Sequence, residues 1–436
     1  MKPGHVVIAT VGSQGDLFPF LAVGRELVRR GHQVTVGAHG MHQQAVAAAG
    51  LEFINATGIA EPDDKAAFAA RAFHPVRGPR FVVRDLAAVD VAASYAALAP
   101  VCAGADAIVT TTLAFAGQIL GETRPLAWLS AVLSPSVFLS ADDPPATGVA
   151  WFDRYVRASS RRGAWLQRAA RVATRSWTAP VRAFRQALGL PPVSAWGDPF
   201  HRGQHAPGGV LAMYSPLLGA LPGDAPPQAL LTGWCRYAPD SGRLDEALRA
   251  FLDAGTPPVV FTLGSAAVHA GELFLRESIQ AARSLGTRAV LLTGSPALRE
   301  RLGRLPEGML AVDYAPHGAL FERGAAVVHH GGIGTTHEAL RAGRPALVVP
   351  HGFDQFDNAE RVARLGVGAS LRAGRYRAGR AAALLGRLID DRRVAGRAAQ
   401  VSATLRAEQG TSRTADMIED AIERRRQSNP STGWGT

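Results

Sequence analysis

The stretch of sequence that decides the fold spans residues 308–366 and reads GMLAVDYAPHGALFERGAAVVHHGGIGTTHEALRAGRPALVVPHGFDQFDNAERVARLG. An apolar run at 325–328 predicts a strand, which ends at two histidines and is followed by a glycine-rich turn and a helix. A second apolar run at 346–350 predicts another strand, and Asp354 and Gln355 come after it. Strand, helix and strand at this spacing predict a right-handed βαβ unit in a parallel sheet.

The same alternation of strand-like and helix-like runs occupies most of the 436 residues, a length that favours two domains over one core. It begins with an apolar run at 5–10, and it restarts after the polar stretch that ends near 245. We therefore predict an α/β fold in which two Rossmann-like parallel-sheet domains face each other across a cleft. The predicted parts are a domain at 1–232, a linker at 233–245, a second domain at 246–426 and a disordered tail at 427–436. Ligands of such sheets bind at the carboxyl ends of the strands.

Composition narrows the classes of protein that the chain can belong to. Hydrophobic residues make up 47% and charged residues 19%, and the formal net charge is +11 with a pI of about 10.6. The basic residues are mostly scattered arginines without aromatic interleaving, which argues against a nucleic-acid partner. Cys102 and Cys235 are too far apart in the sequence to suggest a disulfide framework or a zinc site. Without a signal peptide or a long apolar run, a cytoplasmic location is expected.

The segment 151–186 breaks the strand–helix rhythm, because it is helical throughout and rich in arginine and tryptophan. Such helices can lie on an anionic membrane surface, which would make the protein peripheral to the inner face of the membrane. The other interpretation is a solvated helical lid over a pocket, and we favour the lid.

The glycine-rich turn after the first strand of the opening segment suits a diphosphate. Backbone amides at a helix start carry unsatisfied N–H groups at the positive end of the helix dipole. Gly332 and Gly334 allow close approach, Thr335 adds a hydroxyl, and His330 can donate to a phosphate oxygen. The alternative is an ordinary strand–turn–helix corner. A carboxylate and an amide after the next strand favour the binding site, because they suit sugar hydroxyls, and a nucleotide sugar needs both features.

This segment closely resembles the nucleotide-sugar signature of small-molecule glycosyltransferases with the GT-B fold, and the likeness runs along the whole chain, including SPSVFLSADDPP at 134–145. Within that family the chain is most similar to bacterial rhamnosyltransferases of the rhamnolipid type, then to glycopeptide and macrolide glycosyltransferases.

The resemblance implies a role for further residues on the donor side. Tyr314 stands where a tryptophan often stacks on the base, and His317 would lie near that base. Ser265 would touch the diphosphate, although a helix cap is an equal alternative. Glu338 would hold the ribose hydroxyls, and the pair Asp354 and Gln355 would read the sugar. His329 is expected to be a packed residue at the end of its strand.

Asp16 closes the loop Gly-Ser-Gln-Gly-Asp at 12–16, after the first strand. The loop lacks the Gly-x-Gly-x-x-Gly pattern, which argues against a nicotinamide cofactor. Taken alone, Asp16 is expected to be the N-cap of a helix that starts near Leu17. The resemblance implies a histidine or an aspartate as the catalytic base in this loop, and together with the donor signature it favours the base. An aspartate near its usual pKa is a weak base, so proton transfer would come late in the transition state.

An apolar acceptor is expected on this side of the cleft. Phe18, Phe20, Phe115 and the stretch at 133–139, with Ser134, lie beside it in the predicted arrangement, although at least half of the apolar ones are expected to belong to the core. No metal or cofactor is expected to be required. The nearest acidic pair, Asp142 and Asp143, lies in a proline-rich loop that we interpret as surface structure.

The sequence thus predicts an inverting glycosyltransferase that moves a hexosyl group, rhamnose or glucose, from a dTDP- or UDP-sugar to a hydroxyl of an apolar small molecule. Candidate acceptors are a hydroxy-fatty acid or other lipid, or a polyketide. Two alternatives stay open: a nucleotide-sugar epimerase with the same architecture, and a catalytically silent protein that binds sugar nucleotides or lipids.

Overall fold

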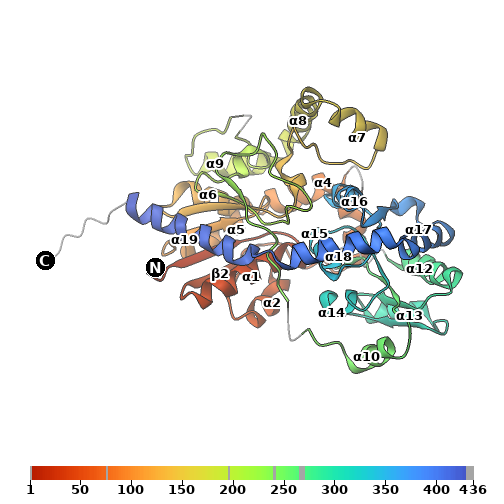
Figure 1. Ribbon diagram of the computed structural model, residues 1–436. Helices are drawn as coiled ribbons and strands as arrows, with labels where there is room; N and C mark the ends of the chain where they lie inside the picture. Colours follow the sequence, from red (N-terminus) through yellow and green to blue (C-terminus); the bar gives the residue numbers. More distant parts are fainter. Residues whose placement is uncertain (1, 75–76, 195–196, 239–241, 265–270, 429–436) are drawn as a thin grey trace.

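The computed structural model describes residues 2–74, 77–194, 197–238, 242–264 and 271–428. Within them, the first domain is built on a parallel sheet of seven strands in the order β3-β2-β1-β4-β5-β6-β7 (Figure 1). These strands are β1 (His5–Ala9), β2 (Gln33–Ala38), β3 (Glu52–Asn55), β4 (Ala107–Thr110), β5 (Ala127–Val132), β6 (Val210–Ala212) and β7 (Ala229–Leu231).

The second domain repeats this plan with six parallel strands among the described residues, in the order β10-β9-β8-β11-β12-β13. These strands are β8 (Val259–Phe261), β9 (Ala289–Leu292), β10 (Met309–Val312), β11 (Ala326–His329), β12 (Ala346–Val348) and β13 (Gly368–Ser370). The prediction of two Rossmann-like parallel-sheet domains is confirmed.

Helices cover both sheets (Figure 1). The first half of the chain contributes α1 (Gln14–Arg29), α2 (Gln43–Ala48), α3 (Lys65–Ala72), α4 (Gly78–Arg80), α5 (Val91–Cys102), α6 (Phe115–Thr123), α7 (Ala150–Arg157), α8 (Ser160–Thr174) and α9 (Ala179–Ala187). The second half contributes α10 (Glu246–Asp253), α12 (Glu272–Leu285), α13 (Pro296–Leu302), α14 (His317–Phe321), α15 (Ile333–Ala342), α16 (Gln355–Arg364), α17 (Ala378–Asp390), α18 (Arg392–Arg406) and α19 (Gly410–Ser428).

The strand order fixes where each sheet can bind a ligand. β1 pairs with β2 on one side and with β4 on the other, and β8 pairs in the same way with β9 and β11. The connections after these strands therefore leave in opposite directions and open a crevice at the carboxyl ends of the strands. The central strands are buried on both faces, as their continuous apolar runs require.

The boundary predicted at residue 426 is wrong, because α19 packs on the first domain and not on the second. Its residues Ala415, Ile418, Ala421 and Ile422 share one buried cluster with residues of β1 and α1. Figure 1 shows α19 running back along the first domain toward the N-terminus. The helix therefore completes the core of the domain with which the chain begins.

The predicted linker and the predicted tail also differ in part from the structure. The predicted linker begins with Trp234, Cys235 and Tyr237, which are buried and not solvated. Of the predicted tail, Gln427 and Ser428 end α19, and 429–436 lie outside the described residues.

No single helix in the described ranges is long and apolar enough to cross a membrane. The bent pair Gly78–Ala88 and Val91–Cys102 meets that test by length and composition only. Several of its apolar residues, among them Val83, Val91 and Leu98, belong to a core cluster of the first domain.

Candidate active site

One cleft of about 1810 Å³ lies between the two domains and is lined by loops of both. The loop after β1 and the glycine turn after β11 approach each other closely at its floor. A Cβ atom added to Gly334, in the turn, would lie 4.0 Å from the Cα of Gly15, in the loop. The predicted base and the predicted diphosphate turn are therefore brought together from opposite halves of the chain.

Asp16 lies in the first turn of α1 with its carboxylate held toward the loop. The N-cap of α1 is Ser13 and not Asp16, because Asp16 is the third helical residue and completes a capping box. Its Oδ2 accepts hydrogen bonds from the Ser13 backbone N–H at 2.7 Å and from the Ser13 hydroxyl at 3.0 Å. Burial raises the pKa of Asp16 above its ordinary value, although the hydrogen bonds from Ser13 oppose that shift. The group is thus a stronger base than the sequence led us to expect.

His330 lies between two glycines that leave room for its ring. A Cβ on Gly264 would be 2.4 Å from Cε1 of His330, and a Cβ on Gly332 would be 2.4 Å from its Nε2. Among the described residues its buried Nδ1 has no hydrogen-bond partner. Burial holds the pKa of His330 well below its ordinary value, so the ring is neutral in the ligand-free protein.

The turn beside His330 has the geometry of an anion site. Gly332 is the N-cap of α15, and Gly334 and Thr335 lie in its first turn, half-buried at the cleft. The free N–H groups of that turn point toward the cleft end of the helix. His329 is fully buried and accepts a hydrogen bond from the Gly331 backbone N–H at Nδ1, which confirms its expected packing role.

Asp354 and Gln355 mark the start of α16 on the same side of the cleft. Asp354 is the N-cap residue, and its Oδ2 accepts a hydrogen bond of 2.8 Å from Nδ2 of Asn358. Burial raises the pKa of Asp354 to about 7, and the negative charge of Asp16 adds to the shift. Gln355 is buried, and its Oε1 accepts hydrogen bonds from the backbone N–H groups of His351 and Gly352. Its Nε2 is the end of the amide that can meet a sugar hydroxyl.

Two of the residues predicted near the nucleoside, Tyr314 and His317, line the same cleft. Tyr314 is 61% exposed at the cleft. His317 stacks on Phe321 with ring centroids 4.7 Å apart, and burial lowers the pKa of His317 to about 4. Ser265 lies outside the described residues.

Glu338, which was predicted to hold the ribose hydroxyls, is paired with an arginine. Its Oε1 accepts a hydrogen bond of 2.9 Å from Nε of Arg236, which comes from the predicted linker. Burial raises the pKa of Glu338, and the charge of Arg236 opposes the rise. Sequence reasoning missed Arg236, since a single arginine in a polar stretch carries no signal of a partner 102 residues later.

The acceptor side differs from the prediction in its details. Phe18 is half-buried on the cleft wall, 5.4 Å from the ring of Tyr237. Phe115 and Phe20 are each only 1% exposed, in the core clusters of the first domain; Phe115 also lines the cleft, whereas Phe20 is a core residue only. Ser134 is buried, and its hydroxyl is bonded to Ser136 and Asn358.

A large part of the apolar wall comes from a part of the chain that the sequence analysis did not single out, within residues 59–98. Its contribution includes Phe68, Val82, Val83, Leu86 and Leu98. Apolar residues at helical spacing give the same pattern whether they face a core or a cavity, so the sequence offered no means to tell these apart.

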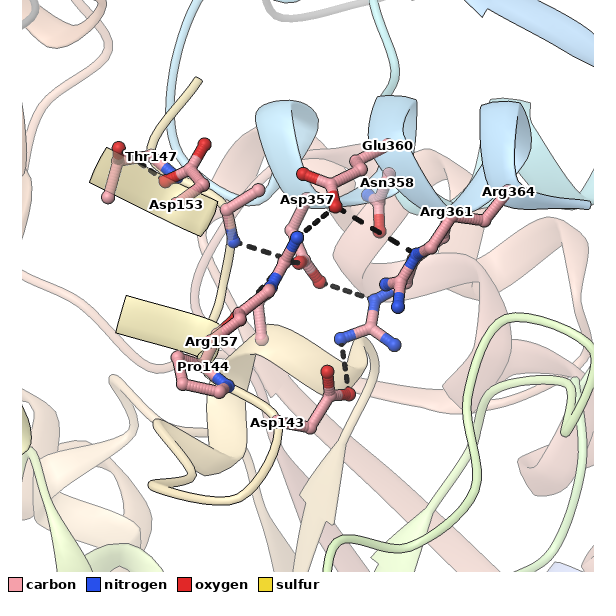
Figure 2. Close-up of polar contacts among 12 residues, drawn as sticks. Asp143, Pro144, Thr147, Asp153, Arg157, Asp357, Asn358, Glu360, Arg361 and Arg364 are labelled. Atoms are coloured by element: carbon pink, nitrogen blue, oxygen red, sulfur yellow. Dashed lines mark hydrogen bonds and ion pairs between the residues drawn. The ribbon is translucent and has the colours of Figure 1, made fainter. Parts of the chain in front are cut away.

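Helix α16 is tied to the acceptor half by an ionic cluster (Figure 2). The guanidinium of Arg361 lies between Asp357 on its own helix, at 2.6 Å, and Asp143 of the acceptor half, at 2.7 Å. Arg157 of α7 pairs with Glu360 and, at 3.4 Å, with Asp357. Asp143 is therefore part of the contact between the domains and not free surface structure.

Metal binding was not expected on sequence grounds. In the described ranges, no group of three or more His, Cys, Asp or Glu residues could hold a metal ion. Whether the reaction needs a metal stays a prediction.

Two facing Rossmann-like domains with this cleft between them define the GT-B class of enzymes. Two family models match the chain: the glycosyltransferase family 28 N-terminal domain at 6–131, and the C-terminal domain described as erythromycin biosynthesis protein CIII-like at 285–420.

Curated relatives match along nearly the whole length. An O-mycaminosyltylonolide 6-deoxyallosyltransferase from Streptomyces fradiae is 33% identical over 97% of this chain and 98% of that protein. A vancomycin aglycone glucosyltransferase from Amycolatopsis orientalis is 32% identical over 84% of this chain and 85% of that protein. The solved glycosyltransferase of kitacinnamycin superposes with a TM-score of 0.70 at 25% identity, over 97% of this chain and all of that one.

The chain belongs to this family of glycosyltransferases and is itself a hexosyltransferase. The relatives agree with the glycopeptide and macrolide part of the predicted resemblance. The predicted closeness to rhamnolipid-type enzymes finds no support in them.

Proposed function

We propose that the protein transfers a hexosyl group from a dTDP- or UDP-sugar to a hydroxyl group of an apolar natural product, with inversion at the anomeric carbon. The acceptor class is suggested by the relatives, of which one is named for a tylonolide and another for the vancomycin aglycone. It also fits the largely apolar wall to which residues within 59–98 contribute.

On the donor side, the N-terminal turn of α15 and His330 bind the diphosphate in this proposal. The Asp354 carboxylate accepts hydrogen bonds from the sugar hydroxyls, and Nε2 of Gln355 donates to them. Glu338 binds the ribose. Tyr314 and His317 flank the base. A neutral His330 suits this site, because its ring N–H can donate a hydrogen bond to the departing diphosphate while the ring carries no charge.

Asp16 is the base in this mechanism. The acceptor hydroxyl attacks the anomeric carbon, the bond from that carbon to the diphosphate oxygen breaks on the opposite face, and the hydroxyl proton moves to the Asp16 carboxylate. The raised pKa of Asp16 improves the match to that proton, while the helix-end amides stabilise the charge on the departing diphosphate.

The observation that carries the proposal is the meeting of both halves at one point. Asp16 and Asp354 come from different domains and line the same cleft, where a Cβ on Gly334 would lie 4.0 Å from the Cα of Gly15. In this proposal the reacting atoms lie between the base and the sugar-reading carboxylate.

The test is calorimetric titration of dTDP-rhamnose, UDP-glucose, dTDP-glucose and UDP-N-acetylglucosamine into wild type and Asp16→Asn. We expect one donor to bind both proteins alike, and only wild type to release nucleoside diphosphate when a hydroxylated polyketide or hydroxy-lipid is added. Binding of none of the four would remove the donor site as assigned. Release without an acceptor, accompanied by a changed sugar, would favour an epimerase.

Although the sequence favours a solvated lid for this segment, its exposed side chains lead us to propose also that α7 and α8 contact an anionic membrane surface, where an apolar acceptor would be met. One exposed stripe along α8 and its C-cap residue consists of Arg161, Trp165, Arg168, Val172 and Arg175, and it alternates cations with large apolar side chains. Residues 154–197 contain nine arginines and no acidic residue.

Sedimentation with vesicles tests this contact. We expect binding to phosphatidylglycerol vesicles and not to phosphatidylcholine vesicles, with loss of binding in Trp165→Ser combined with Val172→Ser. Equal recovery in the supernatant with both lipids would favour the solvated lid.

A further inference from the structure

Asn358 of α16 touches three segments that belong to different parts of the site. Its side chain is fully buried. Its Nδ2 donates hydrogen bonds to Oδ2 of Asp354 at 2.8 Å and to the backbone carbonyl of Gly331 at 2.9 Å. Its Oδ1 accepts a hydrogen bond of 3.2 Å from the hydroxyl of Ser134. The amide thus joins the sugar side, the glycine turn and the acceptor wall.

The chemistry of these partners fixes the orientation of the amide. A carboxylate and a carbonyl can only accept, so both must face the Nδ2 group, which has two N–H donors. A flipped amide would place its oxygen against both acceptors and leave buried lone pairs opposed. Asn358 can therefore hold its three partners in one arrangement.

The helix that carries Asn358 is itself held in place against the acceptor half. Arg361, one turn further along α16, donates to the carbonyl of Leu218 at 2.8 Å and to Asp143. The backbone N–H of Ala146 donates a hydrogen bond of 3.0 Å to Oδ1 of Asp357. Since these contacts restrain α16, a change at Asn358 alters its own three contacts without releasing the helix.

We propose that Asn358 is a positioning residue of the transfer reaction: it fixes the Asp354 carboxylate relative to the glycine turn and couples both to Ser134 on the acceptor wall. This inference rests on the proposed function, in which Asp354 reads the sugar. It predicts an effect that a purely structural role would not have: removal of the Ser134 hydroxyl, on the acceptor side, raises the donor KM.

Four variants test the proposal: Asn358→Ala, the isosteric Asn358→Asp, Ser134→Ala and, as matched control, Asn55→Ala at an exposed site at the end of β3. Initial rates are measured against donor concentration from pH 6 to 9. A lost hydrogen bond to a charged group predicts a donor KM raised about 10-fold in Asn358→Ala, with a smaller change in kcat. The pH at which the rate of Asn358→Ala changes should move upward, because the hydrogen bond from Asn358 lowers the pKa of Asp354 in the wild type. Asn358→Asp should be worse, since it sets a second carboxylate against Asp354.

For Ser134→Ala we expect a donor KM raised about 3-fold, in keeping with one neutral hydrogen bond, while Asn55→Ala behaves as wild type. The proposal is overturned if the Asn358 variants lower only the melting temperature and keep the wild-type donor KM and pH dependence. Should Asn358→Ala not fold, Asn358→Ser and Ser134→Ala carry the same comparison.

A measurement without any donor separates this inference from the proposed function. The carboxyl carbon of Asp354, assigned with Asp354→Asn in protein labelled with ¹³C-aspartate, is titrated by NMR in wild type and Asn358→Ala. A titration displaced to higher pH in the variant supports the positioning role even if no nucleotide sugar is turned over. An unchanged titration refutes it even if the enzyme is an active glycosyltransferase.

Discussion

Replacement of Arg361 by methionine tests the ionic contact that joins the two domains. The arginine side chain is 3% exposed, and the Asp357 side chain that it pairs with is 1% exposed. Removal of one partner of a buried pair leaves an uncompensated charge and costs about 3 to 5 kcal/mol. An unfolding entropy on the order of 0.9 kcal/mol/K for a chain of this length converts that loss to a melting temperature about 3 to 5 °C lower.

The same helix offers a matched control. Arg364 is 49% exposed and lies 4.0 Å from Glu360, so Arg364→Met should change the melting temperature by about 1 °C or less. Asp357→Asn combined with Arg361→Met should regain part of the loss, because the orphaned charge is gone. The melting temperatures of these variants are measured by differential scanning fluorimetry. Equal melting temperatures for Arg361→Met and Arg364→Met would refute the idea that this cluster holds the domains together.

Three further outcomes are expected. Because burial raises the pKa of Asp354 from 3.8 to about 7, the folded state binds more protons than the unfolded chain between these values, and stability falls as pH rises through this window. Asp354→Asn should therefore melt with wild type at pH 4 and above it at pH 8, in thermal scans. Gly12→Ala should lower kcat about 100-fold with unchanged donor affinity, because its Cβ would lie 2.4 Å from Oδ2 of Asp16, and the general base would be displaced. Arg236→Gln should raise the donor KM about 10-fold at pH 7 and less at pH 9, since Glu338 loses the cation that keeps it ionised.

Each of these has a result that contradicts it. Parallel stability curves for Asp354→Asn and wild type would mean that the carboxyl titrates near its ordinary pKa. Gly31→Ala, at a positive φ of 95° with open space around the added Cβ, controls for backbone strain and should keep full activity. A loss in Gly31→Ala equal to that in Gly12→Ala would trace both to strain. A donor KM for Arg236→Gln that does not vary with pH would rule out the proposed ionisation of Glu338.

The donor half of the site could be predicted because its determinants are local. Strand β11 ends where the histidines begin, Gly332 caps α15, and Asp354 caps α16. Each boundary follows from side chains within a few residues of it. The spacing of apolar residues and the residues that begin and end helices were therefore sufficient to predict it.

The parts that could not be predicted depend on long-range placement. The apolar stripe of α19 predicts that the helix packs on a sheet, but it does not specify which one. In the structure the helix packs on the first sheet. Phe115 borders the cleft as predicted, yet at 1% exposure it is also packed in a core cluster, which its position after a strand does not reveal. The partners that Asn358 and Arg361 have in the acceptor half lie more than 100 residues away in the sequence, and no local pattern marks them.

The return of α19 to the first domain has a consequence for how the chain folds during synthesis. The first sheet is complete in sequence at Leu231, but four buried residues of its core arrive only with the helix Gly410–Ser428. At roughly 5 to 20 residues per second, the ribosome needs about 10 to 40 s to deliver that helix after the last strand. During this interval the nascent first domain exposes an apolar groove, so we expect chaperones to engage it there. A truncated first domain ending near residue 232 should aggregate unless residues 410–428 are supplied in trans.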